Sequence, residues 1–138
     1  MHSYLVSLRI SGEALDPSQI TTDLGLEPTQ VRHKGQRRGP NSTWDEAMWE
    51  YEAQPTNGER DWRSLEHGLQ ALLSIFDSRQ RFIREYQQKF NVCLFCGHFS
   101  SSFDGGPTFS PSLLERLGDF GVELFLNTLQ SDEAASSA

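Results

Sequence analysis

Two cysteines and a histidine lie close together late in the chain and are the residues best suited to redox or metal chemistry. Cys93 and Cys96 form a Cys-x-x-Cys pair, and His98 follows two residues later. In redox enzymes such a pair opens a helix, whose dipole lowers the thiol pKa. Here both cysteines lie in an apolar stretch that we expect to be a strand, so their side chains point to opposite faces. Cys96 and His98 share a face, but a zinc site would need two further ligands. We therefore predict reduced, unmetallated, structural cysteines.

No other motif in the sequence marks a catalytic centre. There is no His-Glu-x-x-His, no Gly-x-Ser-x-Gly and no Walker lysine loop. Gly105-Gly106 lacks the lysine of a phosphate cradle, and we interpret it as a turn. No acid stands in a sequence context that raises a carboxyl pKa predictably. The histidines are scattered, at His2, His33, His67 and His98. We predict a protein that is not an enzyme, without catalytic residues or a cofactor.

Acids and tryptophans lie together in the segment 43–53. Glu46, Glu50 and Glu52 have the same parity, so on a strand they share one face. Two interpretations are open: a solvated strand face, or an acidic strip that engages a basic partner or mimics a phosphate backbone. In the second interpretation, Trp44 and Trp49 supply the buried anchors of an interface.

A basic run directly precedes this segment. It has no acid between positions 32 and 38. A charge run in a loop is usually only solvated, but this one could bind phosphate or an acidic surface. The predicted partner-binding residues are therefore Trp44, Glu46, Trp49, Glu50, Glu52, Arg32, Lys34, Arg37 and Arg38.

Length and charge restrict the class of protein. The chain has 138 residues, the size of one ordinary domain, which needs no disulfide or metal to hold a core. The net charge of −7 makes nucleic acid and anionic membranes poor general partners. No basic leader is present, and no apolar run approaches the ~18 residues of a spanning helix. We expect a cytoplasmic protein with no membrane association.

Hydrophobic periodicity and capping residues predict the elements that must position these side chains. The expected strands span 3–10, 43–53, 91–99 and 122–129. The first short helix begins after the N-cap Asp16 and ends at Gly25, and the second begins after Ser110 and ends at Gly121. Between them we expect one long or broken helix over 61–89, capped by Asp61. We interpret 28–43 as a long, mobile, basic loop.

These elements predict an α+β domain over residues 1–130, followed by a flexible tail over 131–138. Its four-stranded sheet carries helices mainly on one face, in the order β-α-β-α-β-α-β. Both ends combine a strand, a helix opened by Asp-Pro-Ser or Ser-Pro-Ser, and a glycine stop. This likeness favours a loose internal duplication of a βα unit, with convergence on one capping chemistry as the alternative.

The face of the sheet opposite the helices is predicted to be apolar. Phe95 and Phe99 have the parity opposite to Leu94, and Phe125 has the parity opposite to Leu124. Leu5 belongs with them. An uncovered patch of this kind marks an interface and would also allow a homodimer through an exposed sheet face. The alternative is a second covering layer made by the long helix or by loops.

The arrangement of caps and turns resembles the bacterial Domain of Unknown Function 4279 family over nearly the whole chain. The segments that carry the resemblance are 15–20, 24–29, Lys34-Gly35, Trp44, Gly105-Gly106, 109–114 and 117–124. The resemblance implies a small single-domain bacterial protein and, for some members, a role as immunity proteins beside secreted toxins. It lends no catalytic residues.

From the residues and the resemblance together we expect a non-enzymatic protein-binding domain. In its specific form, it is an immunity protein that neutralises a basic toxin domain by occlusion. A small-ligand-binding or regulatory domain is the alternative, and an unrecognised enzyme is a third.

Overall fold

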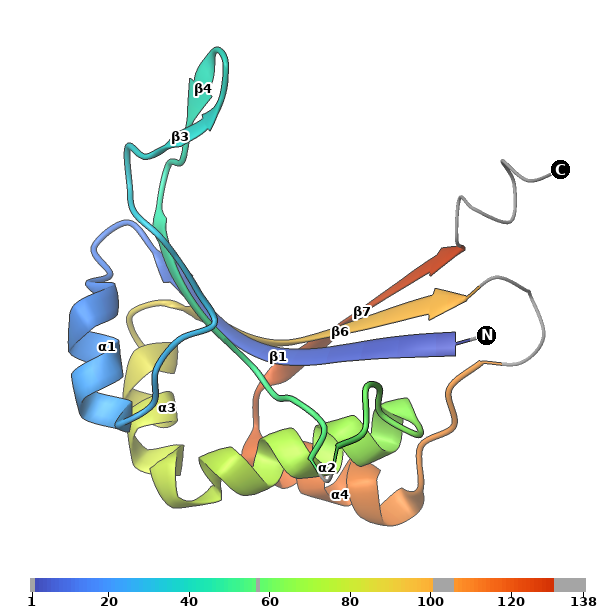
Figure 1. The fold of residues 1–138 in the computed structure, drawn as a ribbon. Coiled ribbons are helices and arrows are strands. Elements are labelled where there is room, and N and C mark those ends of the chain that lie inside the picture. The colour runs from blue at the N-terminus through green and yellow to red at the C-terminus, as the bar shows by residue number, and fades with distance from the viewer. Residues whose placement is uncertain (1, 57, 101–105, 131–138) are drawn as a thin grey trace, which may run out of the picture.

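A five-stranded mixed sheet forms the centre of the molecule, and α-helices cover one of its faces (Figure 1). The structure is a computed structural model that describes residues 2–56, 58–100 and 106–130. The strands stand in the order β2-β5-β1-β6-β7. Their bounds are β1 His2–Gly12, β2 Gln30–Arg32, β5 Ala47–Glu52, β6 Asn91–Ser100 and β7 Glu123–Gln130. The helices are α1 Pro17–Leu24, α2 Leu65–Phe76, α3 Gln80–Gln87 and α4 Pro111–Phe120, with a 3-10 turn η1 at Asp77–Arg79.

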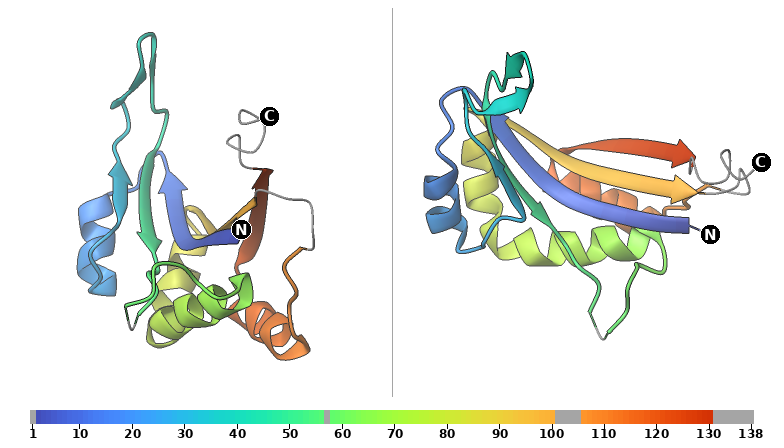
Figure 2. Two further views of the ribbon diagram at one scale, coloured as in Figure 1. Left: turned by 45° about the vertical axis from the view of Figure 1, so that its right-hand side comes forward. Right: turned by 45° about the horizontal axis from the view of Figure 1, so that its top comes forward.

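The α+β class is confirmed, whereas the predicted four-stranded sheet and the simple element order are wrong. The additional strand β2 lies in the segment interpreted as a loop, because three residues are too few to show an alternating pattern. The same segment also contains a small hairpin, β3 Arg37–Gly39 and β4 Ser42–Thr43, which projects beyond the sheet as an arm (Figures 1 and 2). The expected strand over 43–53 is therefore divided between β4 and β5.

The two similar ends of the chain differ in topology. Strand β7 lies parallel beside β6, with α4 between them in sequence. The corresponding strand after α1 is β2, which pairs with β5 rather than with β1. The caps repeat, but the strand pairing does not, so the expected βα duplication extends no further than the helix ends among the described residues.

The helix caps are confirmed. The side chain of Asp16 accepts a hydrogen bond from the backbone N–H of Ser18, and that of Ser110 accepts one from Leu113. Gly25 and Gly121 adopt positive φ angles of 68° and 75°, the left-handed conformation that favours glycine at a helix end.

The long middle helix is broken, and its predicted cap is wrong. The N-cap is Ser64 rather than Asp61, because the Ser64 side chain accepts from the backbone N–H of His67 in extended geometry. The turn η1 separates α2 from α3, and Arg79 within it donates to the Leu24 carbonyl at 2.7 Å. This bond ties the break to the end of α1.

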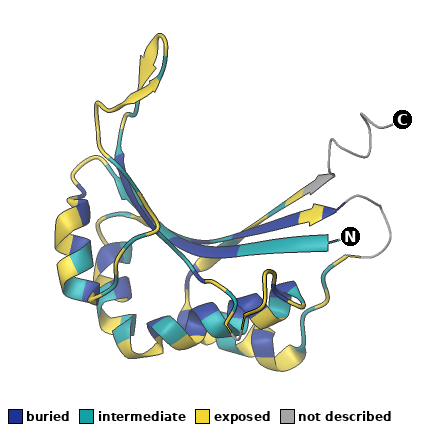
Figure 3. Ribbon diagram, in the orientation of Figure 1, coloured by how far each residue is buried: buried dark blue, intermediate teal, exposed yellow. Residues whose placement is uncertain are grey.

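The core lies between the sheet and the helices (Figure 3). Alternate residues of β1 point toward the helices, and Val6, Leu8 and Ile10 are fully buried there. The opposite face carries no helix from the described residues, and the sheet curves so that this open face is concave (Figures 1 and 2). No helix in the described ranges combines the length and the apolarity that crossing a membrane requires. The expected tail over 131–138 and Gly105 lie outside the described residues.

Candidate binding site on the open face of the sheet

Aromatic side chains line the open face, as the strand parity predicts. Leu94 and Cys96 of β6 are fully buried toward the helices. Phe95 and Phe99 alternate with them and therefore lie on the open face. Phe99 is 38% exposed, and Phe125 of the edge strand β7 is 53% exposed. Within the described ranges no helix or strand forms a second layer over this face of the sheet (Figure 1). The open face is thus an uncovered aromatic surface.

Arg9, Phe95 and Phe125 form a continuous stack across three neighbouring strands. The guanidinium carbon of Arg9 on β1 lies 3.7 Å from the centroid of the Phe95 ring. Phe95 in turn stacks on Phe125, its register partner on β7, with centroids 5.5 Å apart and planes inclined by 18°. The cation–π and ring contacts fix all three side chains relative to one another.

A buried carboxylate, that of Glu50, holds Arg9 at one end of this stack. Glu50 on β5 accepts hydrogen bonds from the Ser7 hydroxyl at 2.7 Å and from Arg9 Nε at 2.6 Å. Glu50 is only 6% exposed, and Ser7 is fully buried. The prediction that Glu50 contacts a partner is therefore wrong, because cross-strand pairing places this acid beside Arg9. Glu50 shapes the open face by orienting Arg9 rather than by offering its own charge.

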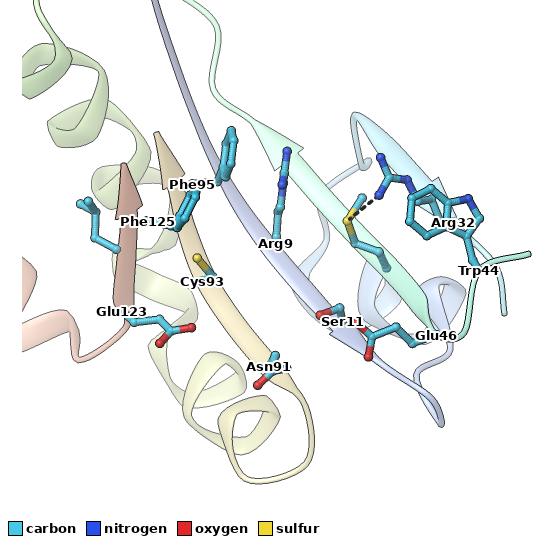
Figure 4. A pocket seen from close by; sticks show the side chains of 12 residues that line it. Arg9, Ser11, Arg32, Trp44, Glu46, Asn91, Cys93, Phe95, Glu123 and Phe125 are labelled. Atoms are coloured by element: carbon cyan, nitrogen blue, oxygen red, sulfur yellow. Dashed lines mark hydrogen bonds between the residues drawn. The ribbon is translucent and has the colours of Figure 1, made fainter. Parts of the chain in front are cut away.

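A pocket of about 440 Å³ opens on this face beside the stack. Figure 4 shows rings and guanidinium groups along one side, with Phe125, Phe95 and Arg9 followed by Arg32 and Trp44. Polar side chains lie along the other side: Glu123, Asn91, Ser11 and Glu46. Cys93, Met48 and Leu124 complete the lining.

The two carboxylates of the pocket, Glu46 and Glu123, form no ion pair among the described residues. The charge of Arg9 is already balanced by Glu50. The polar edge of the pocket can therefore attract a positive group, while its rings offer apolar contact.

The base of the arm forms the far wall of the pocket. Trp44 is held by two backbone hydrogen bonds, from its N–H to the Gln36 carbonyl and from the Gly35 N–H to its own carbonyl. The Arg32 guanidinium carbon lies 4.0 Å from the centroid of the Trp44 ring, and that of Arg38 lies 4.8 Å away. The N–H of Arg32 also points to Met48 Sδ at 4.0 Å (Figure 4).

The structure thus brings only part of the predicted partner-binding set together. Trp44, Glu46 and Arg32 line the pocket. The other basic residues lie on the exposed arm outside it: Lys34, Arg37 and Arg38. Arg37 donates to the carbonyls of its own hairpin, at Gly39 and Pro40. Glu52 lies on the open face but outside the pocket and accepts a hydrogen bond from the Gln54 amide at 3.1 Å.

Trp49 is not available to a partner, contrary to the prediction. It is fully buried, and its indole N–H donates to the Thr21 hydroxyl at 3.0 Å. Its parity on β5 is opposite to that of Glu50, so it points into the helix layer and packs beneath α1. Alternation along the strand alone would have placed Trp49 on the face opposite to the acids. The helices that cover this face then explain why Trp49 is buried.

The two thiols lie on opposite faces, as predicted. Cys93 lines the pocket, whereas Cys96 is fully buried on the helix side. Burial raises the pKa of Cys93, and Glu123 raises it further against the opposing effects of a Phe125 backbone hydrogen bond and Arg9. Burial, with a smaller effect of Cys93, raises the pKa of Cys96 to about 12. Both thiols are protonated at neutral pH and are poor nucleophiles.

A separate cluster of rings lies at the far end of the sheet on the helix side. His98 stacks between His2 and Tyr4, with centroids 5.1 Å from each, and its Nε2 lies 2.9 Å from His2 Nδ1. His98 is 2% exposed, and its Nδ1 has no hydrogen-bond partner in the described part of the chain. Burial, with His2 as a second cause, lowers the pKa of His98. The described residues contain no group of three or more potential ligands that could hold a metal ion.

Comparison with known proteins places the chain in a family. A family model described as a domain of unknown function, DUF4279, matches residues 2–130. No curated protein and no solved structure matches the chain. Because the family model covers nearly all of the sequence, the chain belongs to the DUF4279 family of domains of unknown function.

Proposed function

We propose that this protein is a non-enzymatic binding domain that holds a partner protein against the open face of its sheet. The observation that carries the proposal is the concave face without a helix among the described residues, which carries exposed aromatic rings and a pocket of about 440 Å³. Large exposed rings beside a polar edge are typical of protein interfaces, where aromatic side chains are enriched. The curvature suits a convex element of the partner.

The internal contacts of the face support this proposal. Glu50 holds Arg9, Arg9 lies on Phe95, and Phe95 stacks on Phe125. Side chains that are already fixed lose little conformational entropy when a partner binds. The open face is therefore preorganised over most of its width.

Charge favours a basic partner. The chain carries a net charge of −7, and Glu46 and Glu123 stand at the pocket without an ion-pair partner among the described residues. In its most specific form, the proposal is that the partner is a basic toxin domain, which the protein neutralises by occlusion as a cytoplasmic immunity protein of a bacterium. Acids would speed the encounter, and aromatic contacts would slow dissociation.

A small ligand is the second candidate, and the size of the pocket favours it. Its volume lies within the range of about 300–1,000 Å³ that is common for ligand sites. Such a ligand would combine a positive group toward Glu46 or Glu123 with an apolar body against Phe125.

The test is a calorimetric titration of the purified protein against the proposed toxin, taken as the purified product of the gene beside its own. Phe99→Ala should raise the Kd by about tenfold or more if this ring is an anchor. Glu46→Lys should slow association and reduce its dependence on salt. The matched control is Leu114→Ala, which truncates an apolar side chain on α4, 55% exposed and away from the open face.

Unchanged binding by both open-face variants would refute the proposed surface. Loss of binding in Leu114→Ala alone would move the interface to the helix side. A small molecule that copurifies with the wild-type protein, and is lost in Glu46→Lys, would select the second candidate.

A further inference from the structure

Strand β7 forms one edge of the sheet, and its outer side has no neighbouring strand among the described residues. It pairs with β6 over eight consecutive residues, Glu123 to Gln130, in an uninterrupted parallel register. Its other side therefore presents a row of unpaired backbone N–H and C=O groups. Such a row is a template on which another strand can add.

Most sheet edges are protected against this kind of pairing. Common protections are a very short strand, a lysine, a proline or a bulge. The opposite edge, β2, follows this rule with three residues and a terminal Arg32. Strand β7 has none of these features, and Glu123 is its only charged residue.

Both faces of β7 also leave apolar side chains uncovered. Phe125 on the open face is 53% exposed, and Leu126 on the helix face is 38% exposed. A strand that pairs with β7 would cover both, since neighbouring strands place side chains of the same face side by side. The edge therefore offers hydrogen bonds and apolar contacts together.

We propose that β7 pairs with β7 of a second copy of this chain, in an antiparallel, twofold-symmetric dimer. Self-pairing requires an edge that is complementary to itself. With Glu123 as the only charged residue of β7, this condition is met only when the two strands run antiparallel. Because Glu123 begins the strand, antiparallel pairing places the two carboxylates at opposite ends, whereas parallel pairing would set them side by side.

The symmetry restricts the register of the pair. A twofold axis through the sheet makes one residue face its own copy, and the centre of β7 lies at Leu126 and Asn127. If Leu126 faces itself, Phe125 lies opposite Asn127 of the other copy. Either central register joins the two sheets edge to edge and leaves both open faces on the same side. The inference concerns the edge of the sheet and does not depend on the partner proposed for the open face.

The test is the mass of the purified protein in solution, measured by sedimentation from about 1 μM to about 1 mM. We expect a reversible dimer. Leu126→Lys should raise the dimer Kd by at least about tenfold, because in either register it replaces an apolar contact at or next to the centre of the pair by a positive charge in each copy. The matched control is Phe99→Lys, which alters a side chain of the same 38% exposure on the inner strand β6.

Hydrogen exchange of the wild-type protein gives a second measurement that does not rely on the variant folding. The outward-facing amides of β7 should exchange more slowly as the protein concentration rises. A monomer throughout the range, or a dimer that Leu126→Lys and Phe99→Lys weaken equally, would overturn the proposal. Circular dichroism of both variants identifies any loss of folding.

Discussion

Replacing Glu50 by alanine should lower the free energy of unfolding by about 3 kcal/mol. The carboxylate is 6% exposed and accepts hydrogen bonds from Arg9 and from the fully buried Ser7 hydroxyl. A charge-assisted hydrogen bond contributes about 1.5–3 kcal/mol, and removal of one partner from a buried ion pair costs about 3–5 kcal/mol. The Arg9 side chain is 33% exposed, so water partly compensates its lost partner and the lower end of this range applies.

The assay is urea denaturation, followed by circular dichroism. Glu52→Ala is the matched control, since Glu52 lies on the same strand and face but its side chain bonds only to the exposed Gln54 amide among the described residues. It should change stability by less than about 0.5 kcal/mol. If Glu50→Ala is no more destabilising than Glu52→Ala, the carboxylate does not hold the open face together.

A double-mutant cycle separates the ion pair from the hydroxyl contact. Arg9→Met and Glu50→Gln, singly and together, should show a coupling energy of about 1–2 kcal/mol. A coupling near zero would mean that Arg9 and Glu50 are neighbours without a stabilising interaction.

Three further predictions concern the caps, the buried histidine and the thiols. Asp16→Ala should lower the free energy of unfolding by about 1 kcal/mol, the usual effect of losing an N-cap. Ser110→Ala should lower it somewhat more, because the Ser110 hydroxyl also donates to Glu66 on α2 at 2.9 Å. The urea midpoints of both variants measure these changes. The pKa of His98 is lowered in the folded state, so the unfolded chain binds the proton more tightly. The stability of the fold should therefore fall as the pH drops below about 6.5 and level off below the folded pKa. Urea midpoints measured from pH 8 to pH 5 should change less with pH in His98→Gln than in the wild-type protein. A thiol reagent at pH 7 should modify native Cys93 slowly and Cys96 only on unfolding, because both pKa values are raised; rapid labelling of Cys96 in the folded protein would contradict its burial.

Local patterns predict those features that depend on a few neighbouring residues. Asp16 and Ser110 are recognisable as caps because each is followed by proline at the first helical position. The open face follows from alternation, because Phe95 and Phe125 have the parity opposite to the helix-facing residues of their strands.

Features made by pairing between distant strands are not visible in such patterns. Glu50 and Glu52 have the same parity on the same strand, and only the register that places Glu50 beside Arg9 makes it a buried, paired acid. Strand β2 exists because β5 pairs with it, since three residues carry no periodicity of their own. The pocket combines residues from the base of the arm and from all five strands of the sheet, so its composition requires the tertiary structure.

The central position of β1 has a consequence for the order of folding. Residues 2–11 of β1 pair with residues 91–100 of β6, so this neighbour is synthesised long after β1 itself. Contacts between residues so far apart along the chain form slowly, because a long loop must close first. Until β6 arrives, Val6, Leu8 and Ile10 stand in a strand with one open side. A nascent chain that ends before residue 91 should therefore remain incompletely folded and open to association with other chains.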